Sequence, residues 1–145
     1  LLCDCKTGFL LDIIVYTGKQ TMITIEHNLG ISGSIVSTLL QPYLDLGHTL
    51  YVDNWYTSPY LFQYLHDRKT GAVGTLRLDR KDTPNFPRLK TGEYSSQQSP
   101  FLLAEKWVDR RDVNMLSTTH KNVLKNSGKV DYHSGQQIKK PASVI

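Results

Sequence analysis

Asp4 and Asp53 are the two residues whose type and placement best suit chemistry in this chain. Asp53 stands at the carboxyl end of a predicted strand, where open α/β sheets place ligands and reactive groups. Two carboxylates held close together repel each other and normally need cations. Their oxygens suit Mg²⁺ or Mn²⁺. Two such ions can activate a nucleophile and stabilise the leaving oxygen in phosphodiester chemistry.

A structural interpretation of the same two residues stays open. Asp4 can belong to a hairpin turn, and Asp53 can cap the helix that follows its strand. Residue spacing alone favours this second interpretation, because aspartates are common in turns and caps.

The elements that carry Asp4 are predicted from short apolar runs. Leu1–Cys5 and Phe9–Tyr16 read as an antiparallel hairpin around the turn Lys6-Thr7-Gly8. Alternation over Thr21–Ile25 predicts a third strand. The first strand is expected to lie parallel and adjacent to the strand that ends at Asp53.

A helix is predicted between these strands and Asp53. Ser32 or Ser34 is the expected N-cap. Apolar residues recur at helical spacing from Ile35 to Leu44, Pro42 should kink the last turn, and Gly47 should end the element.

Asp53 itself is placed by a strand, a helix and a second strand. The strand is Thr49–Asp53, and the helix is Ser58–Lys69, capped by Thr57 or Ser58 with Pro59 at its first position. The next strand is Gly71–Leu76. An antiparallel start followed by alternating helices and strands predicts a mixed α/β sheet.

The second half of the chain is more polar. Arg77–Gln98 is predicted to be a long connection. Phe101–Trp107 and Val113–Thr119 are predicted to form a hairpin, and Lys121–Ala142 a loop or linker. The expected organisation is therefore residues 1–79 as one part and 80–145 as another.

Several further side chains have both a binding and a structural interpretation. Basic residues of the long connection can follow a phosphate backbone, although a solvated loop explains them equally well; they are Arg77, Arg80, Lys81, Arg88 and Lys90. Arg110 and Arg111 are neutralised by Asp109 and Asp112. Trp55 and Tyr56 can stack on bases, but packing against the next helix is favoured. His48 and His66 are expected to be solvated or locally bonded rather than ligands.

Composition is that of an ordinary folded protein. The 145 residues are 39% hydrophobic and 21% charged, with a formal net charge of +4 and a pI of about 9.1, which is compatible with a polyanionic partner. No apolar run approaches the roughly 18 residues of a membrane span, so no membrane association is expected. Cys3 and Cys5 are expected to be reduced, intracellular thiols. Both ends of the sequence look truncated, which predicts a fragment of a longer protein.

A series of sequence blocks, in order along nearly the whole chain, resembles the piggyBac family of DNA transposases. These are Leu2-Cys3-Asp4-Cys5-Lys6-Thr7-Gly8, Tyr16-Thr17-Gly18-Lys19, Gly47 to Pro59 with its core Asp53-Asn54-Trp55-Tyr56-Thr57-Ser58, Gly71-Ala72-Val73-Gly74-Thr75, Lys106 to Val113 and Leu116-Ser117-Thr118. The resemblance is strongest to domesticated, transposon-derived members.

That resemblance implies a partial RNase H-like domain followed by the start of a β-containing insertion domain. It implies three metal-binding aspartates, of which Asp4 matches the first and Asp53 the second. The Gly-Val-Asp motif of the third is absent, and Asp131, preceded by Lys129-Val130, does not resemble it. The expected place of the third acid is beyond Ile145 in a parent protein.

The functional expectation is a fragment of a transposase that cleaves and joins DNA with Mg²⁺ or Mn²⁺, inactive by itself. The resemblance further implies DNA as partner, a nuclear location and a parent that can act as a homodimer. Lys139-Lys140 is too short to be a localisation signal. Two alternatives are a domesticated, non-catalytic DNA- or chromatin-binding protein and a decayed transposon remnant.

Overall fold

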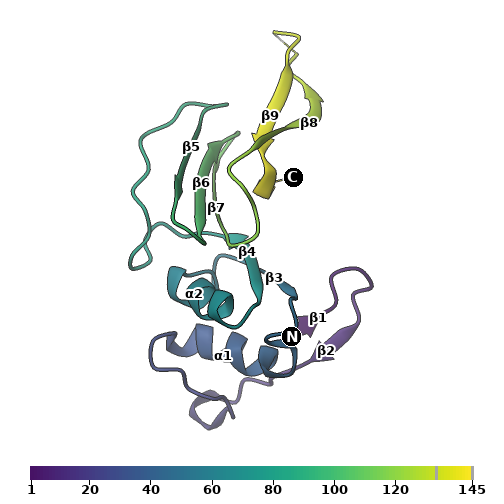
Figure 1. The fold of residues 1–145 in the computed structure, drawn as a ribbon, viewed down its shortest axis with the longest axis vertical. Coiled ribbons are helices and arrows are strands. Elements are labelled where there is room, and N and C mark those ends of the chain that lie inside the picture. Colours follow the sequence, from purple (N-terminus) through teal and green to yellow (C-terminus); the bar gives the residue numbers. More distant parts are fainter. Residues whose placement is uncertain (133, 145) are drawn as a thin grey trace.

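A computed structural model describes residues 1–132 and 134–144. The chain runs from a small N-terminal ribbon through two helices to a larger sheet and a final ribbon (Figure 1). In order, its elements are β1 (Leu2–Cys3), β2 (Leu10–Asp12), η1 (Gly18–Gln20), α1 (Gly30–Leu40), η2 (Gln41–Tyr43), β3 (Thr49–Val52), α2 (Pro59–Asp67), β4 (Gly71–Thr75), β5 (Tyr94–Gln98), β6 (Leu103–Val108), β7 (Asp112–Ser117), β8 (Leu124–Val130), β9 (Gln137–Pro141) and η3 (Ala142–Val144).

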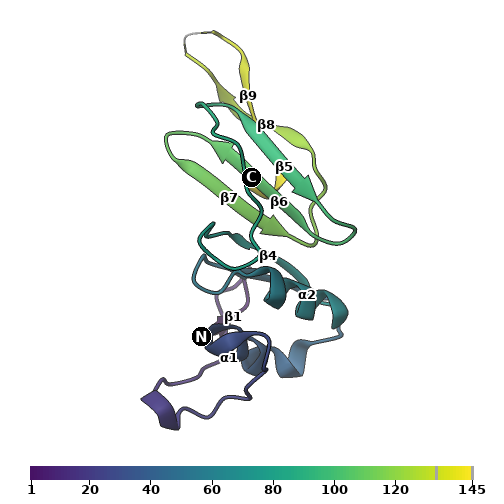
Figure 2. The same cartoon turned by 90° about the vertical axis from the view of Figure 1, so that its left-hand side faces the viewer.

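A five-stranded mixed sheet connects the two halves of the chain. Its strand order is β3-β4-β7-β6-β5, in which β3 and β4 are parallel and the other neighbours are antiparallel. The helices lie beside β3 and β4, while β8 and β9 extend from the opposite end (Figure 2). The predicted mixed α/β sheet is confirmed. Because β4 pairs with β7, the sheet crosses the expected division at residue 79, and that division stays a prediction.

The helix α2 forms where its sequence signals predicted. The Ser58 side chain accepts a hydrogen bond from the Leu61 amide at 3.2 Å, and Pro59 fills the first helical position. Its inner face is completely buried, through Leu61, Phe62 and Leu65. This face packs against Ala72 of β4 and residues of β6 and β7 in a single apolar cluster.

The helix α1 differs from its prediction at both ends. It begins at Gly30, after Leu29, without a side-chain cap, so the expected Ser32 or Ser34 cap is wrong. The Ser34 hydroxyl instead accepts the Glu26 amide at 3.0 Å. The predicted irregular last turn at Pro42 is present as the 3₁₀ helix η2, but the helical region ends at Tyr43, so the expected end at Gly47 is wrong.

Three other predicted segments are corrected. Thr21–Ile25 is not a strand, because alternation alone supplies no partner for its backbone groups. The end of the expected long connection is β5, whose polar sequence suits an edge strand that pairs only with β6. The expected C-terminal loop contains the β8–β9 hairpin.

A buried carboxylate links this hairpin region to the sheet. Glu105 of β6 is 1% exposed and accepts hydrogen bonds from the Tyr94 hydroxyl, at 2.7 Å, and from the Ser143 hydroxyl. Lys140 of β9 lies over the Trp107 ring at 4.6 Å. Polar contacts from β5, β9 and η3 therefore meet on β6.

Tyr94 should resist ionisation because of this setting. Burial is the main cause that raises its pKa to about 12, a hydrogen bond with Ser96 opposes the shift, and Glu105 adds to it. Because its pKa is raised in the folded state, Tyr94 contributes to the free energy of unfolding. This contribution is complete below the unfolded pKa of about 10 and is lost as the pH rises through about 12. A titration of tyrosinate absorbance should lose its step near pH 12 in Tyr94→Phe. An unchanged alkaline limb in that variant would contradict the assignment.

No helix in the described part of the chain is long and apolar enough to cross a bilayer.

Candidate functional site

Asp4 lies in a tight turn directly after β1. Its Oδ2 accepts hydrogen bonds from the Thr7 amide, at 2.9 Å, and from the Thr7 hydroxyl, at 2.5 Å. The hydrogen bond from the Thr7 hydroxyl is the largest cause that lowers the pKa of Asp4. A second carboxylate in contact with Asp4 would raise its pKa. The pKa is instead lowered, so the hydrogen bonds from Thr7 determine the direction of the shift. The carboxylate is ionised at neutral pH and held in one orientation.

Asp53 lies directly after β3, in the turn that leads into α2. Its Oδ1 accepts the Trp55 amide at 3.0 Å. Its carbonyl accepts the Thr57 amide at 3.1 Å and the Thr57 hydroxyl at 2.8 Å. Ser58, rather than Asp53, caps α2. The helix-cap interpretation of Asp53 is therefore replaced by a role in the turn before the helix.

Asp4 and Asp53 line the same cavity. The cavity has a volume of about 1310 Å³, and its walls come from residues 1–5, α1, β3 and the turn after β3. The first strand was expected to lie parallel and adjacent to β3. In the described residues β1 pairs with β2, and β3 pairs with β4, so this prediction is wrong. β1 is only two residues long and irregular in register, and its ladder partner is β2. The two aspartates line one cavity without sharing a strand ladder.

The donor chemistry of this pair fits a hard divalent cation. Within residues 1–132 and 134–144, Asp4 Oδ1 and Asp53 Oδ2 take part in no hydrogen bond, so each carboxylate keeps one oxygen available. Mg²⁺ is commonly bound by one or two carboxylates together with waters and substrate phosphates. Among the described residues, no three His, Cys, Asp or Glu side chains form a complete metal-binding group. Asp4 and Asp53 are therefore two candidate oxygen donors without a third acidic, His or Cys side chain beside them among the described residues.

Asp131 does not complete this set. It follows β8, in the turn of the terminal hairpin at the other end of the molecule (Figure 1). Its Oδ2 accepts the Ser134 hydroxyl at 2.6 Å and the Ser134 amide at 3.1 Å.

The five basic residues of the long connection are not equivalent. Arg77 forms an ion pair with Asp79 at 2.6 Å, which raises the pKa of Arg77 and lowers that of Asp79. Arg80 donates to backbone carbonyls of the turn after β3. The side chains of Lys81, Arg88 and Lys90 form no hydrogen bond or ion pair with another described residue. Only these last three are left with uncommitted charges.

Asp112 pairs with Lys106 at 2.8 Å rather than with Arg110 or Arg111 in the described residues, which differs from the expected neutralisation.

The histidine and aromatic candidates have local structural contacts. His66 stacks on Phe101 with centroids 4.8 Å apart, and His48 lies edge-on to Tyr43 at 6.2 Å. Tyr56 packs against the core as expected. Trp55 does not, because 59% of it is exposed.

Two features of this region were not anticipated from the sequence. Gly74 of β4 touches the turn after β3, since a Cβ on Gly74 would lie 2.2 Å from Thr57 Oγ1. Arg80 also reaches this turn. The glycine-rich run Gly71-Ala72-Val73-Gly74 was a signal for close backbone approach, whereas no local pattern reveals the partner of Arg80.

The chain matches the model of the family described as Transposase IS4 over residues 1–145. It is similar to a piggyBac transposase seen by cryo-electron microscopy in a synaptic complex with hairpin DNA, at 20% identity and a TM-score of 0.56. The similar region covers 79% of this chain and 24% of that one, so the chain spans about a quarter of that protein. At this identity the likeness shows the fold. Because the family model covers every residue, the chain belongs to this transposase family, as its piggyBac-type motifs predicted.

Proposed function

We propose that the chain provides two of the metal-binding carboxylates, Asp4 and Asp53, of a DNA transposase catalytic region. Transposases of this family generally use divalent metals. The observation that carries the proposal is that both aspartates line one cavity and each retains an uncommitted oxygen. The DNA in the piggyBac synaptic complex supports DNA as the substrate class.

The chain's own residues hold the two carboxylates ready for this role. Thr7 fixes Asp4, and the Trp55 amide fixes Asp53, so little reorganisation is needed on binding. A bound Mg²⁺ or Mn²⁺ would supply charge stabilisation at a phosphodiester and a water or 3′ hydroxyl of lowered pKa. A third carboxylate is required for full activity, and we expect the chain by itself to bind metal weakly and to cleave no DNA.

Asp53→Asn should weaken Mn²⁺ binding by about tenfold or more, because a charged ligand is replaced by a neutral one. Paramagnetic broadening of the Thr7 and Trp55 amide signals during a Mn²⁺ titration measures the affinity at this cavity. Asp67→Asn is the matched control, since Asp67 is an exposed acid at the end of α2. Equal loss of affinity in both variants would show non-specific binding.

Incubation with duplex DNA and Mg²⁺ or Mn²⁺ tests the proposed inactivity. Strong nicking that disappears in both Asp4→Ala and Asp53→Ala would overturn it while supporting the metal site.

A second candidate is a non-catalytic DNA-binding module. It is favoured by the uncommitted charges of Lys81, Arg88 and Lys90. Affinity for duplex DNA should then fall with salt, persist in a chelator and decrease when these three residues are changed to glutamine. Binding that requires Mn²⁺ and Asp53 would favour the transposase site instead.

We extend the first proposal to a nuclear location and to a parent protein that works as a homodimer. Both rest on family membership alone.

A further inference from the structure

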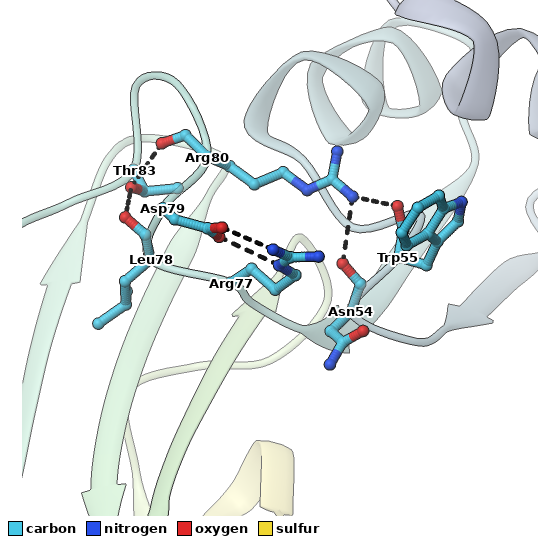
Figure 3. A network of polar contacts seen from close by, with 7 residues as sticks. All are labelled: Asn54, Trp55, Arg77, Leu78, Asp79, Arg80 and Thr83. Carbon is cyan, nitrogen blue, oxygen red and sulfur yellow. Dashed lines mark hydrogen bonds and ion pairs between the residues drawn. The ribbon is translucent and has the colours of Figure 1, made fainter.

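The segment 77–83 lies against the turn that carries Asp53. It follows β4, and Figure 3 shows the Arg80 guanidinium extended toward the backbone of Asn54 and Trp55. Arg80 Nη2 donates to the Asn54 carbonyl at 3.4 Å and, more closely, to the Trp55 carbonyl. The Tyr60 hydroxyl, in the first turn of α2, donates to Asp82. The segment is thus attached on both sides of the β3–α2 junction.

The segment is also ordered within itself. Thr83 Oγ1 donates to the carbonyls of Arg80, at 2.8 Å, and Leu78, at 2.9 Å. Arg77 pairs with Asp79 and does not compete for the turn (Figure 3). The bonds donated by Thr83 fix the backbone from which Arg80 extends.

The Arg80 contact connects to Asp53 through a single peptide group. The Asn54 carbonyl and the Trp55 amide belong to the same planar peptide unit. That amide donates to Asp53 Oδ1 at 3.0 Å. A cation at the carbonyl polarises the unit and strengthens the hydrogen bond that its N–H donates. Arg80 therefore influences both the orientation and the environment of the Asp53 carboxylate without touching it.

We propose that Arg80 is a positioning residue for Asp53: it holds the peptide that orients this carboxylate, so that Asp53 Oδ2 remains directed to a divalent cation. This inference rests on the proposed metal-binding function of Asp53. It assigns Arg80 a task beyond the DNA-phosphate contact considered from the sequence, because its Nη2 donates to two backbone carbonyls of the Asp53 turn.

The direction in which Mn²⁺ affinity changes on removal of Arg80 distinguishes a positioning role from a purely electrostatic one. Arg80 is a cation close to a proposed cation site. If it acted only through its charge, its removal would reduce repulsion and strengthen Mn²⁺ binding. If it positions Asp53, its removal weakens binding. Loss of an orienting partner of a metal ligand commonly costs ten- to a hundredfold in affinity, and we expect about tenfold here.

The experiment compares Arg80→Gln, Arg80→Lys and the charge-matched control Arg77→Gln in the intact chain. One readout is Mn²⁺ affinity from broadening of the Trp55 amide signal. The other is hydrogen exchange of the same amide without metal, which reports the turn itself. Arg80→Gln should weaken Mn²⁺ binding about tenfold and speed Trp55 exchange, while Arg77→Gln changes neither. Arg80→Lys should restore part of both, since lysine donates to carbonyls but lacks the planar fork.

Unchanged Trp55 exchange, or tighter Mn²⁺ binding, in Arg80→Gln would overturn the inference. Exchange of α2 and β4 amides shows whether each variant is folded. A wild-type chain that binds no Mn²⁺ near Asp53 would overturn the proposed function, and Arg80 would then be a structural contact whose effect on Trp55 exchange remains measurable. The two failures are thus distinguishable.

Discussion

Glu105→Ala should lower the free energy of unfolding by about 2–4 kcal/mol. Glu105 is 1% exposed and accepts hydrogen bonds from Tyr94 and Ser143. Truncation leaves the Ser143 hydroxyl without this acceptor, whereas the Tyr94 hydroxyl can still donate to Asn122. It also opens space inside the sheet, and a buried unsatisfied donor alone costs about 1–3 kcal/mol. Urea unfolding followed by tryptophan fluorescence measures the change.

The design includes two comparison variants. Glu105→Gln keeps the volume and one carbonyl acceptor, so it should cost about 1 kcal/mol. Glu93→Ala removes an exposed glutamate that accepts the Lys90 amide, and its cost should stay within about 0.5 kcal/mol. If Glu105→Ala cost no more than Glu93→Ala, Glu105 would not be an energetic link between β6 and η3.

Gly74→Ala should destabilise the chain by about 2–3 kcal/mol. The new Cβ would lie 2.2 Å from Thr57 Oγ1 and 2.7 Å from the Val52 carbonyl oxygen. Removal of a glycine normally favours the folded state by about 0.4–1 kcal/mol through the unfolded chain, so a net loss can come only from these contacts. Because Thr57 Oγ1 also donates to the Asp53 carbonyl, the substitution should move the turn that carries Asp53.

A double-mutant cycle identifies the source of this loss. Thr57→Ala removes the nearest obstructing atom, so Gly74→Ala should cost less in that background by about 1 kcal/mol. Thr75→Ala, on the exposed next residue of β4, is the control and should change stability by less than about 0.5 kcal/mol. Additive effects of Gly74→Ala and Thr57→Ala would show that the two positions do not interact.

Local signals in the sequence were sufficient for α2 and for the β3–α2–β4 unit. Ser58, Pro59 and the apolar spacing that follows them act within a few residues, so their effect does not depend on distant partners. The same holds for the hairpin of β6 and β7. The order of predicted elements indicated the mixed sheet, and the family motifs added a fold similar to that of piggyBac transposase.

Features that depend on distant partners could not be predicted. The polar strand β5 exists because β6 provides its ladder, and Thr21–Ile25 lacks such a partner. The Ser34 hydroxyl accepts a hydrogen bond from the Glu26 amide and does not cap the helix. At the candidate site, the residue types of Asp4 and Asp53 were informative, whereas the cavity between them and the contacts of Arg80 arise only from the folded chain.

The central place of β4 has a consequence for how the chain folds. Its parallel partner β3 lies one helix away, but its other partner β7 arrives only after a long intervening stretch, as in the pairing of Val73 with Ser117. Local contacts generally form faster than distant ones. During synthesis, β4 therefore presents an apolar edge with open hydrogen-bonding groups before β7 is available, and such edges promote association between chains. Once the strand 112–117 has been made, its pairing with β4 covers this edge as well as completing the sheet.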